Sequence, residues 1–349
     1  MIPHEIVLGC DPEFFLRRDG VVVGSEEVVR KGLESYGGKV IRDGVQAEIN
    51  PRAHTCRQVL GENINVCLDM VRKTLDGMPG YTADFGVSVD LTRESYDTLS
   101  DDCKEFGCKP SYNLDPDVPQ VIQLSASEYP IRSAGGHIHL GGQDTDTVNS
   151  LKNAPRIVLL LDMLLGNTMV LLDRSEGNIE RRKHYGRAGE FRLPPYGIEY
   201  RTLSNFWLRH PVLFSLAFGL AREACDIMLN DMDDKFKPLV QYSRIREAID
   251  TNNFALAMEN FEAYKDMLLE VSGEDTRYPI NRDNIDGFMA LVNDGIGGFG
   301  DDVFGNWAEC YDIGANGFLR EYKKVTHDKG ASTCDSIRVQ GSRVGVCGG

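Results

Sequence analysis

The stretch SAGGHIHLGG, residues 133–142, decides how the fold of this chain is interpreted. It has the pattern of a strand in which His137 and His139 stand one residue apart, with a pair of glycines on each side. Side chains at positions i and i+2 of a strand point to the same face, so both imidazoles are predicted to point in one direction. Glycines on both sides allow backbone or a ligand to come close. Two histidines on one strand face therefore indicate a metal or phosphate site.

Four further pairs of polar residues have the same spacing in segments that otherwise resemble strands. They are Asp11 and Glu13 in GCDPEFFL, Glu48 and Asn50 in VQAEINP, Glu190 and Arg192 in GEFRL, and Glu199 and Arg201 in GIEYRTL. If these strands share a sheet, one of its faces carries carboxylates, imidazoles and guanidiniums together. Unpaired charge in a low-dielectric setting is very costly, so metal ions and a polyphosphate would resolve the conflict.

The alternative interpretation of each pair is the solvated face of an antiparallel strand, where polar and apolar residues alternate. Glu190 and Arg192 fit this alternative best. Among the arginines, Arg201 is the one least explained by an ordinary surface salt bridge, because it shares a strand face with Glu199 in a segment whose other residues are mostly apolar. Solvated strands favour Thr, Lys and Ser, whereas acids, histidines and arginines dominate the five pairs.

Composition indicates that the chain buries a large core and that its surface is not suited to nucleic acid. The chain has 349 residues with 42% hydrophobic content, enough for one large domain or for a domain with an appendage. A net charge of −15 argues against a surface for phosphate backbones, which need clustered Lys and Arg. The nine cysteines form no CxxC motif, and their odd number, without a secretory signal, favours a reducing cytoplasm.

Apolar periodicity predicts helices between the polar strands, which gives an α+β fold class with helices packed on one side of a sheet. The predicted helices are 56–75, 155–173, 211–230, 243–250 and 253–269. The apolar stretch 157–172 is too short for a bilayer and contains polar residues, so no membrane span is expected. Residues 93–130 lack periodicity and are interpreted as a surface insertion or lid.

We expect a catalytic domain over residues 1–270 and a C-terminal extension over residues 271–349. The run GIGGFG (295–300) is interpreted as a flexible connection rather than a nucleotide loop, because no strand precedes it. Residues 318–349 contain six Lys or Arg against three acids, a basic tail on an acidic chain. The Cys347-Gly348-Gly349 ending is interpreted as a disordered tail rather than as a carboxylate presented for ligation.

An arginine-rich segment, ERRKHYGRAGEFRLPPYGIEYRTLSNFW, includes the last polar strand. It contains Arg181, Arg182, Arg187, Arg192 and Arg201. The planar guanidinium suits phosphate and carboxylate oxygens and stays charged when it is desolvated. The alternative is a set of ordinary surface salt bridges with nearby glutamates.

Together, these motifs and their order resemble the glutamine synthetase and glutamate–cysteine ligase superfamily. The closest similarity is to its phage-encoded branch, the carboxylate–amine ligases of the phiEco32-like type 2 family. The segments GCDPEFFL, DGVQAEINP, SAGGHIHLGG and YGIEYRTLSNFW carry the resemblance, which covers about residues 5 to 210.

The resemblance implies a curved antiparallel sheet with helices on its convex side. It also implies that the concave side binds ATP with two or three divalent cations, Mg²⁺ or alternatively Mn²⁺. The implied metal ligands are Asp11, Glu13, Glu48, His137 and Glu199. By the resemblance, His139, Arg187 and Arg201 would bind the cofactor, and Arg187 and Arg201 would be catalytic. Arg182 and Arg192 of the arginine-rich segment are further candidates for cofactor binding, and Glu190 is a candidate general base. Two departures from the family pattern are an Asp at position 11, followed by Pro12, and a single second-strand acid, Glu48, beside which Asn50 offers an oxygen.

The expected activity is amide or peptide bond formation through an acyl phosphate, between a carboxylate and an amine that are small molecules or peptides. The sequence does not identify either substrate, and a homo-oligomer is compatible with it. If the gene is carried by a phage, the host cytoplasm is the expected location. Two alternatives remain open, a divalent-metal hydrolase and a catalytically inactive binding or structural protein on the same fold.

Overall fold

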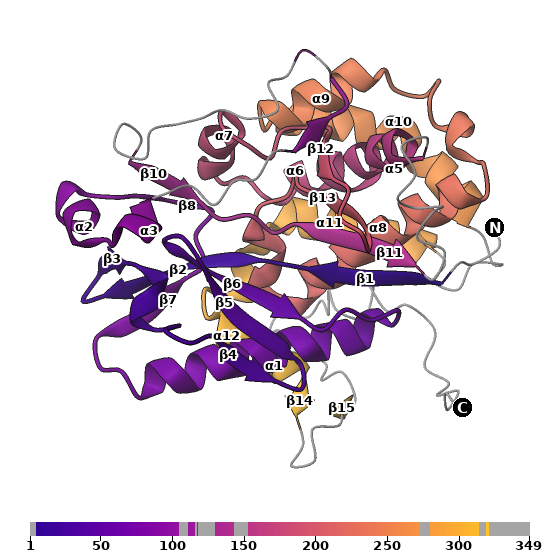
Figure 1. Ribbon diagram of the computed structural model, residues 1–349. Helices are drawn as coiled ribbons and strands as arrows, with labels where there is room; N and C mark the ends of the chain where they lie inside the picture. The colour runs from indigo at the N-terminus through magenta and orange to yellow at the C-terminus, as the bar shows by residue number, and fades with distance from the viewer. Residues whose placement is uncertain are drawn as a thin grey trace.

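The computed structural model describes residues 5–104, 111–115, 117, 130–142, 153–272, 280–313 and 319–320. Antiparallel sheets in the middle of the molecule carry helices on their outer sides (Figure 1). The α+β class is therefore confirmed. The predicted lid, 93–130, and the C-terminal extension lie partly outside the described residues, and the basic tail lies almost entirely outside them.

The polar strands belong to two larger sheets rather than to one. The five-stranded sheet has the order β1 (Ile6–Cys10), β11 (Ile138–Gly142), β13 (Gly197–Tyr200), β12 (Glu190–Arg192) and β9 (Tyr112–Asn113). The six-stranded sheet has the order β3 (Val21–Val23), β2 (Glu13–Arg18), β6 (Gln46–Pro51), β5 (Gly38–Asp43) and β4 (Leu33–Ser35), with β7 (Tyr81–Asp84) paired to β2. Two small ribbons pair β8 (Ser88–Asp90) with β10 (Ile131–Ser133), and β14 (Asp312–Ile313) with β15 (Leu319–Arg320).

The N-terminal half of the chain places one long helix against the six-stranded sheet. Helix α1 (Arg57–Asp76) buries Leu60, Ile64 and Val71, one stripe at helical spacing, and packs on β5 and β6. The helix ends at Gly77, shortly before Pro79. The prediction of a helix over 56–75 is confirmed. Short helices α2 (Arg93–Thr98) and α3 (Asp101–Lys104) follow it in a segment where no regular element was expected.

A helical layer covers the five-stranded sheet. Helix α5 (Ala154–Leu161), the π-helical turn η2 (Asp162–Gly166) and α6 (Asn167–Val170) form one nearly continuous rod, which confirms the predicted buried helix. Helix α8 (Pro211–Leu229) begins with a proline in its first turn, and the His210 imidazole caps it by accepting from Val212 N at 3.1 Å. Helices α5 and α8 contact strands of this sheet (Figure 1).

Five more helices and four short 3₁₀ turns complete the regular structure of the described residues. They are α7 (Gly177–Arg182), α9 (Tyr242–Asp250), α10 (Phe254–Ser272), α11 (Arg282–Asp294) and α12 (Val303–Cys310), with single 3₁₀ turns at Ser25–Glu27, Asn205–Arg209, Asp233–Lys235 and Ile296–Phe299. Helices α9 and α10 confirm the last two predicted helices. The glycine run 295–300 forms the 3₁₀ turn after α11, not a strand-to-helix phosphate loop.

Candidate active site

The chain passes from the five-stranded sheet to the six-stranded sheet through Asp11 and Pro12, the two residues between β1 and β2. Backbone hydrogen bonds hold this crossing on both sides. Ile49 N donates to Pro12 O at 2.9 Å, and Glu13 N donates to Gly135 O at 2.9 Å. The crossing therefore brings the acids of β2 and β6 next to the histidine segment and β13.

The first cluster of potential ligands lies across the five-stranded sheet. In the register of its strands, His139 of β11 stands opposite Glu199 of β13, and Glu199 stands opposite Arg192 of β12. Asp11 joins this row at the crossing, with Oδ2 3.2 Å from His139 Nε2. One ligand atom each of Asp11, His139 and Glu199 lies within 4.8 Å of the others. We call these three residues the mixed cluster.

His137 precedes β11 and is buried beside the mixed cluster. Its Nδ1 lies 3.1 Å from Asp11 Oδ1 and 3.6 Å from Glu199 Oε1. Only 3% of its surface is exposed, yet neither ring nitrogen makes a hydrogen bond to a described residue. A Cβ on Gly135 would come within 2.6 Å of His137 Nε2, so the glycine there is required for the close approach that the sequence predicted.

The second cluster consists only of carboxylates, from Glu13, Asp43 and Glu48, and we call it the acidic cluster. Glu13 and Glu48 stand directly opposite each other on β2 and β6. Like charges in this position repel. Gly135 N donates to Glu13 Oε2 at 2.6 Å, and the Asn50 amide donates to Glu48. Asn50 thus supports Glu48 through its nitrogen.

Asp43 completes the acidic cluster, and our sequence reasoning did not include it. It ends β5, and the register that places Ile41 opposite Glu48 puts Asp43 on the same face as Glu48. The available signal was Asp43-Gly44 between two strand-like runs, which is a strong hairpin signal. Gly44 has φ +58°, and the two-residue loop it begins returns the chain to Gln46.

Burial and mutual repulsion raise pKa values in the acidic cluster. Burial, with the Asp43 charge, raises the pKa of Glu13 to about 8. Burial and the charges of Asp11 and Glu13 raise the pKa of Glu48 to about 9. Burial also raises the pKa of Asp43. These three groups hold their negative charges only against a free-energy cost, which a cation would remove.

The mixed cluster has the opposite electrostatics. Burial disfavours the charged form of Asp11, but His139 and His137 outweigh it and hold the pKa of Asp11 well below its usual range. Likewise, His137 and Arg201 outweigh burial and lower the pKa of Glu199. For His137 burial dominates, with the Arg201 charge adding to it, and lowers its pKa. The carboxylates of this cluster are stabilised by positive charge that the chain itself provides.

Two of the predicted arginines contact the mixed cluster. Arg201 forms an ion pair with Glu199, and its Nε lies 3.4 Å from Glu190 Oε1. Arg192 donates from Nε to Glu199 Oε1 at 2.9 Å. Glu190 is 8% exposed and accepts from Gly186 N at 2.6 Å and Ser111 Oγ at 2.8 Å. The alternative of a solvated strand face is therefore wrong for Glu190, which is held in a buried network.

Arg182 and Arg187 make other contacts. Arg187 donates to the carbonyls of Arg182 at 2.7 Å and Lys183 at 3.0 Å, at the end of α7. Arg182 is buried and donates to Asn252 Oδ1 at 3.0 Å, and burial lowers its pKa to about 10. Nucleotide binding by these two arginines stays a prediction. Arg181 is also buried, where it donates to three carbonyls of residues 201–203.

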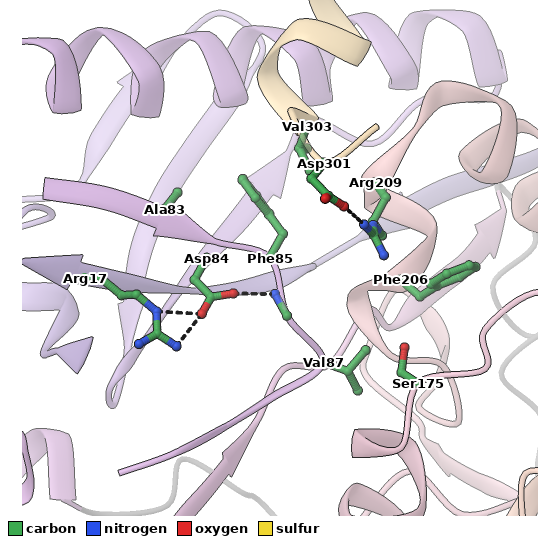
Figure 2. Close-up of a pocket in the computed structure, with 11 residues that line it drawn as sticks. Arg17, Ala83, Asp84, Phe85, Val87, Ser175, Phe206, Arg209, Asp301 and Val303 are labelled. Atoms are coloured by element: carbon green, nitrogen blue, oxygen red, sulfur yellow. Dashed lines mark hydrogen bonds and ion pairs between the residues drawn. The ribbon is translucent and has the colours of Figure 1, made fainter. Parts of the chain in front are cut away.

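A cavity of about 440 Å³ is lined by residues 83–87, Arg17, Phe206 and Arg209, among others. Figure 2 shows two ion pairs facing it, Arg17 with Asp84 and Arg209 with Asp301, around apolar side chains. The Asn205 amide connects its wall to the active-site crossing, since Nδ2 donates to Glu13 O at 2.9 Å and to Phe85 O at 3.3 Å. No acid of either cluster lines this cavity.

One segment of the chain matches a known family. It contains both histidines, Glu199, Arg192 and Arg201. Residues 120–270 match the family model of phage phiEco32-like COOH.NH2 ligase-type 2. This match confirms the family that the sequence motifs indicated. The family description indicates a carboxylate–amine ligase, an enzyme that joins a carboxylic acid to an amine. Asp11 and the acidic cluster lie outside the matched residues, so their assignment depends on the geometry described above.

No curated protein gives a significant match to the chain. Among the helices that the structure describes, none has the length and apolar character that crossing a membrane would require.

Proposed function

We propose that the protein is an ATP- and divalent-cation-dependent ligase that forms an amide or peptide bond through an acyl-phosphate intermediate. The family match supports the ligase class. The observation that carries the finer proposal is that two clusters of potential ligands meet at Asp11 and Pro12. One of them, the acidic cluster, consists only of carboxylates. Negative charge concentrated in this way fits divalent cations and the triphosphate that they accompany.

The donor set fits divalent cations. Asp11 Oδ1 and both ring nitrogens of His137 are buried without a hydrogen-bond partner among the described residues. Such atoms are costly unless a ligand engages them. Asp11 and Glu199, with an imidazole, would hold one ion, and Glu13, Asp43 and Glu48 would hold another. Oxygen ligands favour Mg²⁺, and the imidazole makes Mn²⁺ a suitable substitute. When bound, such ions would neutralise and orient the phosphate oxygens.

The proposed reaction has two steps. A substrate carboxylate oxygen attacks the γ-phosphorus of ATP, and the bond to the β–γ bridging oxygen breaks as ADP leaves. An amine nitrogen then attacks the acyl carbon, phosphate leaves with the electrons of the C–O bond, and the nitrogen gives up a proton. Arg201 and Arg192 would stabilise negative charge on the transferred phosphoryl group. Glu190 positions Arg201, and its role as general base stays a prediction.

The proposal predicts nucleotide binding that depends on the cation. Isothermal titration with the non-hydrolysable analogue AMP-PNP should give binding with Mg²⁺ and none in EDTA. A second assay should show ADP formation only when an acid and an amine are both added from a metabolite panel. Cation binding without nucleotide binding would favour a divalent-metal hydrolase, and binding of neither would indicate an inactive scaffold. Both results contradict the proposal.

A further inference from the structure

Tyr196 lies against His139 at the edge of the mixed cluster. It belongs to the turn between β12 and β13, and 47% of its surface is exposed. Its Oη lies 3.2 Å from His139 Nδ1, and the two ring centroids are 5.4 Å apart with an angle of 34° between the ring planes. A Cβ on Gly141 would come within 2.3 Å of Tyr196 O, so the glycine at position 141 allows this turn to approach β11.

The other nitrogen of His139 faces the carboxylates. Its Nε2 is buried 3.2 Å from Asp11 Oδ2 and makes no hydrogen bond to a described residue. Nδ1 faces the Tyr196 hydroxyl, so a proton on Nδ1 would be donated to Oη and would leave the Nε2 lone pair free beside the Asp11 carboxylate. A lone pair beside an ionised carboxylate is repulsive unless a cation stands between them.

We propose that His139 binds the divalent cation of the mixed cluster through Nε2, and that Tyr196 positions it by accepting a hydrogen bond from Nδ1. Ligating histidines almost always donate their second ring N–H to an outer partner that fixes the tautomer and the ring orientation. This inference rests on the proposed function and exchanges two implied roles. His139 becomes the nitrogen ligand in place of His137, and Tyr196 becomes a positioning residue that the family motifs did not include.

The test measures Mn²⁺ affinity by electron paramagnetic resonance of free Mn²⁺, using the full chain without nucleotide. Tyr196→Phe keeps the ring and removes only the hydroxyl. Tyr112→Phe is the matched control, because Tyr112 is 48% exposed on β9 and packs its ring on Phe191 at 5.6 Å. Y196F should weaken Mn²⁺ binding about tenfold, the usual cost of losing an outer partner, and Y112F should leave it unchanged. The unfolding temperatures of both variants in EDTA should equal that of the wild type.

Two histidine variants test the exchange of roles. His139→Gln should weaken Mn²⁺ binding more than Y196F does, and His137→Gln should weaken it less than H139Q. Equal Mn²⁺ affinity of Y196F and the wild type, or a larger loss in H137Q than in H139Q, overturns the inference while leaving the proposed function intact. Failure of the wild-type chain itself to bind Mn²⁺ overturns the proposed function and this inference with it.

Discussion

The mixed cluster and the acidic cluster lie on either side of one sheet crossing and solve the problem of buried charge differently. In the mixed cluster, histidines and Arg201 hold the pKa values of Asp11 and Glu199 below their usual range. In the acidic cluster, burial and neighbouring carboxylates raise the pKa values of Glu13 and Glu48 to about 8 and about 9. The difference teaches that the chain itself provides the mixed cluster with positive charge, whereas the acidic cluster consists only of carboxylates.

The largest effect is expected from Glu199→Gln. Glu199 neutralises two guanidiniums, so its loss should leave Arg192 and Arg201 without their shared anion. Removing one partner of a buried ion pair destabilises a protein by about 3 kcal/mol or more. Urea unfolding in EDTA should show this loss, and ADP formation should disappear. Unchanged stability in EDTA would contradict the self-neutralised character of the mixed cluster.

In the absence of cations, Glu48→Gln should not lower the free energy of unfolding, in contrast to Glu199→Gln. It removes one of three repelling acids, so the variant in EDTA at pH 8 should be at least as stable as the wild type. Adding Mn²⁺ at a hundred times its dissociation constant should stabilise the wild type by about 2.7 kcal/mol and E48Q by much less. The measurement is the unfolding midpoint with and without Mn²⁺. A large destabilisation of E48Q in EDTA would remove the contrast between the clusters.

Asp43→Asn sharpens the definition of the acidic cluster. If Asp43 provides a ligand oxygen, the variant should bind Mn²⁺ at least about tenfold more weakly, a loss of about 1.4 kcal/mol of binding free energy. Asp90→Asn on β8 is the matched control, because Asp90 is exposed and lies outside both clusters. Calorimetric titration of the two variants with Mn²⁺ separates a ligand from a general change in net charge. Equal affinities would exclude Asp43 from the site.

Local spacing was sufficient to identify most members of the two clusters. Asp11, Glu13, Glu48, His139 and Glu199 all belong to i, i+2 pairs, because strand periodicity can be seen directly in the sequence. Helices with a clear apolar stripe, such as α1, were predicted for the same reason.

The rest depends on relations that no local window contains. Asp43 joins Glu48 only through the hairpin register, and Tyr196 reaches His139 only because two strands pair. Burial of Glu190 depends on Ser111, which is distant in sequence. The division into two sheets depends on the direction that the chain takes at Pro12.

The smallest effect on Mn²⁺ affinity is expected for a buried acid outside both clusters, which tests whether burial alone explains the raised pKa values. Asp162, in the π-helical turn, accepts from the hydroxyls of Tyr200 and Tyr242, each at 2.7 Å, and burial raises its pKa to about 7. Because the folded-state pKa exceeds the ordinary value, the folded chain binds this proton more tightly. The contribution to wild-type stability is therefore present at about pH 4 and is lost as pH rises to about 7.

Asp162→Asn should reduce the slope of the unfolding free energy against pH over this range. The slope changes by up to about 1.4 kcal/mol per pH unit, because the folded wild type binds up to one more proton than the unfolded chain. Unfolding free energies measured in EDTA at several pH values give this slope. Mn²⁺ affinity should stay at the wild-type value, because Asp162 belongs to neither cluster. E48Q should instead change both the slope and the affinity. An equal loss of Mn²⁺ affinity in D162N and E48Q would contradict the assignment of the cation site to the two clusters. It would show that removing any buried acid weakens Mn²⁺ binding, so the comparison of the two clusters would no longer explain the affinity.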